Sequence, residues 1–392
     1  MLLSRGGSWP IAGLGLAQTI AWASSYYLPA MLAVPMARDL GVAPATVFGA
    51  LSAALLISAA LGPLAGRLID RHGGRPLLIL TSLLFAAGLG ALALAQDAVG
   101  LFAAWTIIGV AMSMGLYEAA FATLVHLYGR DARRAITGIT LIAGFASTVG
   151  WPLTAWLEHS LGWREACGVW AALHLLVGLP LHLLLPNRGQ SAECDVRGAA
   201  LTAPDPVVTA PRWTSVLLAT AFAVTWFTST AMAAHLPQLL VLTGMSLAAA
   251  VTAAALVGPA QVAARVLEFG LLRRVHPLLS ARLASIAHPV GALLLLVVGA
   301  PAGLAFTILH GAGNGILTIA KGTLPLVMFG PQSYGARQGW LMVPARLAQA
   351  AAPLAFGLVL DRVGVGALWL SAGVGLLGCG ALLLLRARAG AA

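Results

Sequence analysis

Long apolar runs separated by short polar loops dominate the chain. The runs consist of Ala, Leu, Val and Gly without alternating polar positions. Most are about 20 residues long, which is the length a helix needs to cross a bilayer. The pattern predicts an all-α integral membrane protein with twelve transmembrane helices, near residues 11–34, 46–66, 77–96, 99–127, 135–157, 166–186, 213–236, 247–269, 280–299, 303–327, 338–360 and 366–385.

The distribution of polar residues divides these spans into two groups. Residues 187–211 contain several charged side chains and three prolines, and we interpret them as a cytoplasmic linker. Residues 1–186 then form an N-terminal six-helix half, and residues 212–392 form a C-terminal six-helix half. We expect the first apolar run to remain as a membrane anchor, because it continues past 20 residues without a convincing cleavage site.

Composition supports the membrane assignment. Hydrophobic residues make up 60% of the 392 positions and charged residues only 9%, whereas roughly a quarter of the residues in soluble domains are charged. The short loops leave no room for a sizeable soluble enzyme domain. The three cysteines are far apart and without metal-ligand spacing, so neither a disulfide framework nor a metal site is expected.

The net charge of +10 follows from topology. With both termini in the cytoplasm, outside loops hold Arg38, Arg164 and Arg362. Inside loops then hold most of the basic residues, notably Arg67, Arg71, Arg75, Arg130, Arg133, Arg134, Arg273, Arg274, Arg386 and Arg388. This asymmetry satisfies the positive-inside rule. We therefore expect a bacterial inner-membrane protein with both termini in the cytoplasm. We expect it to be a monomer that contacts the lipid bilayer and does not bind nucleic acid.

The two halves resemble each other at a shift of about 200 residues. Equivalent positions include Arg67 and Asp70 with Arg265 and Glu268, Gly138 and Pro152 with Gly339 and Pro353, and Trp22, Ser25 and Tyr26 with Trp226, Ser229 and Thr230. Duplication explains these matches economically. Parallel six-helix repeats around a midplane site are typical of secondary transporters that rock one half against the other.

The segment that ends the second span resembles a known signature. Gly66, Leu68, Asp70, Arg71, Gly73 and Arg75 are similar to the GxLxDRxGRR motif of the major facilitator superfamily, with Gly74 where that family usually has a base. The resemblance implies a twelve-helix transporter with helices 1, 4, 7 and 10 around a central cavity. Ser25 to Pro29, Tyr128, Arg133 and Gly138 loosely resemble the monocarboxylate transporter and oxalate/formate antiporter branch, whose acidic residue in helix 1 is missing. Some similar bacterial permeases export trivalent arsenicals.

The motif has a physical interpretation as a latch. Asp70 can pair with an arginine or a helix N-terminus when the cytoplasmic side is closed, while Arg71 and Arg75 lie among anionic headgroups. The alternative is a plain topology signal. Arg265 and Glu268 are either its counterpart in the second half or a helix-end pair without a role in transport.

Three charged side chains fall well away from the ends of the predicted spans, where each costs at least ~3 kcal/mol and is a functional candidate. Glu118, Lys321 and Arg346 lie roughly 5–9 Å to the cytoplasmic side of the membrane centre, counted at ~1.5 Å per residue. Lys321 follows His310, Asn314 and Thr318 on one helical stripe. Comparable stripes carry the aromatic residues Trp22, Tyr26 and Trp226.

These residues suggest a working scheme. Lys321 and Arg346 bind a carboxylate, with His310, Asn314, Trp22, Tyr26 and Trp226 as further substrate contacts. Glu118 changes its partner or its protonation state as the halves rock, which couples substrate to protons or to a counter-substrate. The alternative is that Glu118 and Lys321 form a structural interhelical salt bridge, that the aromatic residues only pack, and that His310 is a satisfied buried histidine.

Other features predict structure. The spacings Gly62 to Gly66 and Gly311 to Gly315 allow close helix contact. The alternative for the second spacing is a bend that gates the transport route. His288 precedes Pro289 and is expected to hydrogen-bond to backbone that the proline frees.

Other classes of protein are less well supported. The sequence contains no HExxH or GxSxG motif, and Ala320 to Thr323 lacks the glycine of a phosphate-binding loop, so we expect neither a membrane enzyme nor ATP-driven pumping. No cofactor is implied. A sensor that kept the transporter fold would show an appended signalling segment. The favoured solute is a small organic anion, and the alternative is export of a small toxic compound.

Overall fold

The computed structural model describes residues 9–186, 211–270 and 275–386. Every regular element in these ranges is helical. The predicted linker, apart from residue 211, lies outside the described residues, as do Arg273, Arg274 and Arg388.

The helices of the N-terminal half follow the six predicted spans in order. They are α1 (Trp9–Ala23), α2 (Leu28–Asp39), α3 (Pro44–His72), α4 (Arg75–Leu94), α5 (Ala98–Gly115), α6 (Tyr117–Tyr128), η1 (Gly129–Asp131), α7 (Ala132–Ala143), α8 (Ala146–Leu161), α9 (Trp163–Leu173), the π-helical turn η2 (His174–Gly178) and α10 (Leu179–Leu183).

The C-terminal half contains longer uninterrupted helices. They are α12 (Arg212–Leu242), α13 (Leu247–Ala255), α14 (Val257–Gly270), α15 (Pro277–Val298), η4 (Ala300–Ala302), α16 (Gly303–Phe329), α17 (Tyr334–Val363), η5 (Gly364–Gly366) and α18 (Ala367–Leu384).

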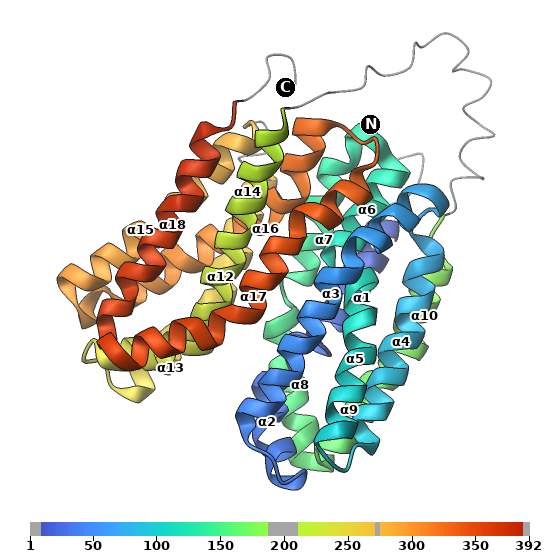
Figure 1. Ribbon diagram of the computed structural model, residues 1–392, viewed down its shortest axis with the longest axis horizontal. Helices are drawn as coiled ribbons and strands as arrows, with labels where there is room; N and C mark the ends of the chain where they lie inside the picture. Colours follow the sequence, from blue (N-terminus) through green and yellow to red (C-terminus); the bar gives the residue numbers. More distant parts are fainter. Residues whose placement is uncertain (1–8, 187–210, 271–274, 387–392) are drawn as a thin grey trace. The chain divides into compact units, whose positions relative to one another are not determined.

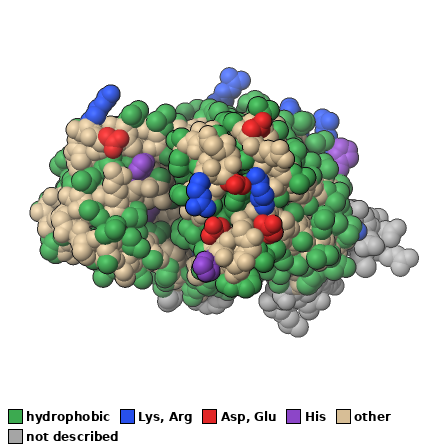
Figure 2. Space-filling view, turned by 90° about the horizontal axis from the view of Figure 1, so that it is seen from below, with side chains coloured by type: hydrophobic (Ala, Val, Ile, Leu, Met, Phe, Trp, Pro, Cys, Tyr) green, Lys and Arg blue, Asp and Glu red, His purple; other side chains and the backbone are tan. Residues whose placement is uncertain are grey.

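These helices account for the twelve predicted spans. Nine stretches of the described residues are long and apolar enough to cross a membrane. Two of them, Ala98–Leu161 and Tyr334–Leu384, each hold two predicted spans, and the first predicted span is the pair α1 and α2. Figure 2 shows hydrophobic side chains over much of the visible surface and few charged ones. The protein is an all-α integral membrane protein with two six-helix halves.

Several predicted spans are built from two helices instead of one. Pro29 opens α2, and a residue that precedes a proline is disfavoured in a helix, so the first span breaks at residues 24–27. The fourth span breaks at Leu116, where the Gln18 side-chain amide donates a 2.6 Å hydrogen bond to the Gly115 carbonyl. A side chain from α1 thus replaces a missing backbone partner. Apolar periodicity carries no sign of these breaks.

Contacts divide the chain into two compact units. Residues Met1–Ala210 together with Phe329–Trp340 form the first unit, and Pro211–Met328 together with Leu341–Ala392 form the second. Figure 1 shows each unit as a bundle of long helices. The first turns of α17 pack with the N-terminal unit, although the sequence places them in the second half.

Short polar and proline signals start the helices. Asp97 caps α5 by accepting a 2.8 Å hydrogen bond from the Gly100 amide, and Pro residues occupy the first turn of α3, α4 and α15. Gly73 ends α3 with a φ of 78°, a conformation that favours glycine. This explains why the motif has a glycine at position 73.

Candidate functional site

Two buried cations lie against one indole ring in the second unit. The Lys321 ammonium on α16 lies 3.6 Å from the ring centroid of Trp226, and the Arg346 guanidinium on α17 lies 5.5 Å from it. Lys321 is 5% exposed and Arg346 is 3% exposed. The structure therefore brings together three predicted site residues from three helices.

Arg346 is also held by its own helix. Its Nη1 donates a 3.0 Å hydrogen bond to the Gln349 side-chain oxygen, three residues along α17. Gln349 is itself fully buried. A planar guanidinium fixed at one N–H presents its fork in a defined direction, which suits recognition of a carboxylate.

Helices α12 and α16 run antiparallel beside this group. Trp226 of α12 meets Lys321 of α16, and three residues later Ser229 accepts a 3.0 Å hydrogen bond from the Asn314 side-chain nitrogen. The predicted polar stripe on α16 therefore has two kinds of neighbour: Lys321 contacts the Trp226 ring, whereas Asn314 bonds to the Ser229 hydroxyl. Thr318 donates to the Asn314 carbonyl of its own helix.

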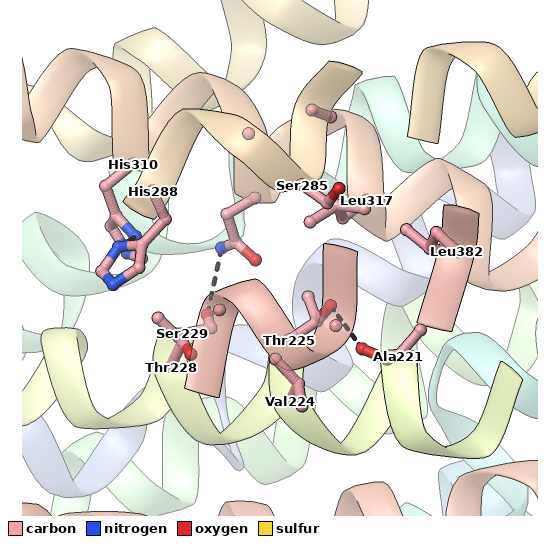
Figure 3. Close-up of a pocket in the computed structure, with 15 residues that line it drawn as sticks. Ala221, Val224, Thr225, Thr228, Ser229, Ser285, His288, His310, Leu317 and Leu382 are labelled. Atoms are coloured by element: carbon pink, nitrogen blue, oxygen red, sulfur yellow. Dashed lines mark hydrogen bonds between the residues drawn. The ribbon is translucent and has the colours of Figure 1, made fainter. Parts of the chain in front are cut away.

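His310 and Asn314 line a pocket inside the second unit (Figure 3). The pocket has a volume of about 40 Å³ and lies among α12, α15, α16 and α18. His310 Nδ1 lies 3.0 Å from His288 Nδ1. The expectation that His288 bonds to freed backbone was wrong, because its Nδ1 faces the other imidazole.

The predicted aromatic residues of the first unit form a separate cluster. Trp22 lies 5.6 Å from Tyr26 and 5.1 Å from Tyr117 between ring centroids, and Tyr26 lies 5.2 Å from Tyr27. Tyr27 continues the cluster to Trp151 at 5.7 Å. These rings surround the break between α1 and α2. Glu118 lies in the first turn of α6, where a helix N-terminus favours a negative charge.

Glu118 belongs to the first unit, whereas Lys321 and Arg346 belong to the second. Its pairing with these bases stays a prediction, as does a shared cavity for Trp22, Tyr26 and Trp226.

Asp70 caps the start of α17. Its two carboxylate oxygens accept 2.8 Å hydrogen bonds from the amides of Gly335 and Ala336. Both ends of this contact belong to the first unit. The structure thus shows Asp70 paired with a helix N-terminus, and its role as a latch stays a prediction.

The helices meet so closely here that only glycine fits. A side chain at Gly66 would collide with the Gly335 backbone, and one at Gly335 would lie 2.5 Å from the Gly66 carbonyl. A turn away, a side chain at Gly339 would lie 2.6 Å from the Gly62 carbonyl. The predicted close contact through Gly62 and Gly66 is confirmed, and its partner is the first part of α17.

Arg265 and Glu268 on α14 are both buried, at 4% and 5% exposure. Arg265 Nε donates to the Gly315 carbonyl of α16 at 3.3 Å, and its Nη2 donates to Gln261 at the same distance. A side chain at Gly311 would lie 2.7 Å from the Val257 carbonyl of α14, and one at Gly315 would lie 2.5 Å from the Gln261 carbonyl. Arg265 therefore ties α14 to α16 within the second unit.

The chain was also compared with models of known protein families. A model described as Major Facilitator Superfamily matches residues 14–306, most of the chain. The chain belongs to the major facilitator superfamily. It is a multi-pass secondary transporter, and not an enzyme.

Two curated relatives match only part of the chain. Multidrug resistance protein MdtH of Aeromonas hydrophila subsp. hydrophila is 31% identical over 158 residues, which cover 40% of this chain and 39% of the relative. MdtH of Aeromonas salmonicida is 30% identical with the same coverage. The chain thus matches about two fifths of the length of these relatives.

Solved transporter structures match nearly the whole of this chain. The E. coli fucose:proton symporter FucP has a TM-score of 0.73 at 15% identity, covering 95% of this chain and 98% of that one. The proton:xylose symporter XylE has a TM-score of 0.71 at 14% identity, covering 95% and 94%. The human organic anion transporter MFSD10 has a TM-score of 0.67 at 18% identity, covering 95% and 98%. At these identities the likeness shows the fold.

The structure explains how this member departs from the superfamily signature. A side chain at Gly74 would collide with Thr123 of α6, so the base that the signature usually carries has no space. Arg71 is exposed and Arg75 is half-buried. The motif thus keeps its cap Asp70, its helix-ending Gly73 and two of its bases.

Sequence reasoning missed several residues of this site. Gln349 lies three residues from Arg346, so helical spacing could have indicated it. The sequence predicted a backbone partner for His288. Spacing along one helix cannot reveal its contact with His310, because that contact joins two helices. Gln18 was not predicted as a site residue, and its side chain bonds to the Gly115 carbonyl at the break in the fourth span.

Replacing Asp70 by alanine is expected to expose the start of α17 to exchange. The change removes both acceptors from the Gly335 and Ala336 amides, at a cost of about 1–2 kcal/mol. Hydrogen–deuterium exchange of peptides covering residues 334–338 should accelerate, and less so in Asp70→Asn, which keeps one oxygen. Asp97→Ala, which removes the carboxylate cap of α5, should leave these amides protected. Unchanged exchange in Asp70→Ala would contradict the cap.

Proposed function

We propose that this transporter moves a small organic anion of the monocarboxylate kind by alternating access, either with protons or in exchange for another solute. The observation that carries the proposal is the convergence of Lys321 and Arg346 on Trp226 inside the second unit. Buried cations are rare in a membrane segment and usually mark a substrate or ion pathway.

Electrostatics favours an anion over a neutral or cationic solute. Two buried positive charges near one ring repel each other, and this repulsion is strong where the dielectric constant is low. A carboxylate between them would lower this energy and could accept from both side chains. The indole face adds a cation–π contact to each of the two cations.

Glu118 supports coupling in this proposal. We propose that it exchanges its partner or its proton as the two halves rock, with Trp22, Tyr26, Trp226, His310 and Asn314 as further contacts of the transport route. Asp70 and Gly66, with Arg71, Gly73 and Arg75, would control closure on the cytoplasmic side, and Arg265 with Glu268 would be their counterpart in the second half.

The experiment is a thermal-shift screen of the purified protein against monocarboxylates and dicarboxylates. An anion that binds between the bases should raise the unfolding temperature of the parent. The affinity should fall about 10–100-fold in Lys321→Gln and in Arg346→Gln, since each change removes a charged hydrogen-bond partner. Uptake into proteoliposomes under a pH gradient then measures transport.

Arg282→Gln is the matched control. Arg282 is a cation of the same unit, but it donates to the carbonyls of Leu382, Leu383 and Leu385 at the end of α18. This variant should lose stability while it keeps the anion response. An equal loss of response in Arg282→Gln would remove the assignment to Lys321 and Arg346.

Export of a small toxic compound is the second candidate. The partial likeness to a multidrug resistance protein favours it. In this case neutral or cationic toxicants, such as drugs or trivalent arsenicals, would stabilise the parent and organic anions would not. The same screen therefore separates the two functions.

We also propose where the protein lies. The inside loops are rich in arginine, so both termini face the cytoplasm of a bacterial inner membrane. A monomer contains both halves and is sufficient for alternating access.

A further inference from the structure

We infer that His288 and His310 form a proton-binding site within the second unit, separate from the anion site at Lys321 and Arg346. The pair takes up one proton and shares its charge across two imidazoles. That the bound proton is coupled to transport rests on the proposed function, whereas proton binding itself does not.

The two rings are hydrogen-bonded through equivalent atoms. Their Nδ1 atoms lie 3.0 Å apart, the ring centroids 5.0 Å apart, and the planes at 70° to each other. A hydrogen bond between two Nδ1 atoms needs a proton on one of them and a lone pair on the other. In the neutral pair, one ring therefore has its proton on Nδ1 and the other has its proton on Nε2.

This arrangement determines where an added proton goes. The ring that donates through Nδ1 keeps a lone pair on its Nε2, and the incoming proton binds there. That ring becomes an imidazolium, and its bond to the neutral ring becomes a stronger, charge-assisted hydrogen bond. No other bond forms or breaks, and the proton leaves by the same atom.

The pocket gives water access to Nε2 of His288, and we therefore take His288 as the ring that donates through Nδ1 and receives the proton. The Nε2 atom of His288 and the hydroxyl of Thr228 are buried and have no hydrogen-bond partner among the described residues. Both residues line the pocket (Figure 3). Its volume of about 40 Å³ suits a few water molecules, and is too small for an organic solute. Other lining groups are the polar side chains of Thr225, Ser229, Ser285 and Asn314.

The charged groups nearest to the pair lie on α14, α15, α16 and α17. Among the pocket residues described, α12 and α18 contribute none that titrates, although buried Cys379 lies beside Gly378. Arg282 on α15 is bonded to the end of α18. Arg265 and Glu268 lie on α14, which packs against α16 at Gly311 and Gly315. Lys321 follows His310 on α16, and Arg346 meets Trp226 beside it.

The pair and the anion site are connected by one helix. His310 and Lys321 are about 16 Å apart along α16 at ~1.5 Å per residue, with Asn314 bonded to Ser229 between them. Lys321 and Arg346 oppose a further positive charge on the histidines. An anion bound to those two cations would remove part of this opposition, so anion binding favours proton uptake and the reverse holds by linkage.

Two measurements on the full-length protein test the inference. The first is an NMR titration of the histidine ring nitrogens in nanodiscs, with His288→Asn and His310→Asn for assignment. One imidazole pair should bind a single proton as the pH is lowered from 8 to 4, and the signature of the Nδ1 to Nδ1 hydrogen bond should be lost in both variants. Two rings that stay neutral across this range would overturn the site. If a variant does not fold, the parent titration, assigned through its Nδ1 to Nδ1 hydrogen bond, decides.

The second measurement is anion flux in proteoliposomes. Accumulation driven by a pH gradient should fall about tenfold in both variants, while anion exchange at equal pH is kept in His288→Asn, since His288 is not among the proposed substrate contacts. His235→Asn is the control, because His235 lies in the same unit, outside the pocket, and bonds to the Pro353 carbonyl at 2.9 Å. Full accumulation in both pair variants, with loss in Glu118→Gln, would assign coupling to Glu118 instead. A parent that moves no anion would refute the proposed function, and the titration alone would then decide the proton site.

Discussion

Replacing Gly66 by alanine is expected to separate the start of α17 from α3. The new methyl group would collide with the Gly335 backbone, which cannot turn away as a flexible side chain can. Overpacking of this kind costs about 1–3 kcal/mol. The shift also moves Asp70 from the Gly335 and Ala336 amides, so the cap of α17 weakens with the packing. Thermal unfolding in detergent and hydrogen exchange of residues 334–338 measure the two effects.

Gly62→Ala is the matched control for this prediction. Gly62 lies one turn earlier on the same face of α3, but a methyl group there would lie 3.9 Å from the Gly339 carbonyl, an ordinary contact. The Gly62 variant should therefore unfold near the parent temperature. If both variants behave alike, the close contact at Gly66 is not what holds the two helices together.

Replacing Trp226 by leucine is expected to destabilise the second unit strongly. The ring lies against two buried cations, and a desolvated cation–π contact contributes about 2 kcal/mol or more. Trp226→Phe keeps an aromatic face and should lose less. In a double-mutant cycle, Trp226→Leu with Lys321→Met should reveal a coupling energy of about 1–2 kcal/mol, because Met keeps the apolar stem without the charge.

Equal stability of the Leu and Phe variants would show that Trp226 stabilises the second unit by apolar packing and not by its cation–π contacts. A coupling energy near zero would show that Lys321 is held by other contacts. Thermal unfolding of the four proteins of the cycle gives both answers.

Much of the membrane architecture follows from the sequence alone. Twelve apolar runs predict twelve spans because each helix must satisfy its backbone hydrogen bonds internally and cover about 30 Å of hydrocarbon. The Gly66 to Arg75 motif correctly predicts the superfamily. The stripes correctly place Lys321, His310 and Asn314 on one helix, since helical period depends only on spacing along the chain.

Tertiary structure decided which of these residues meet. Arg346 and Lys321 converge on Trp226 because three helices bring them together, and no spacing within one helix encodes this contact. The division of the α16 stripe, with His310 turned to His288, likewise depends on the packing of α15. The break at Leu116 depends on Gln18 from α1, and the space missing at Gly74 depends on Thr123 from α6. Apolar patterning selects which residues enter the membrane, whereas contacts between distant helices select their partners, and those contacts arise only once the helices pack.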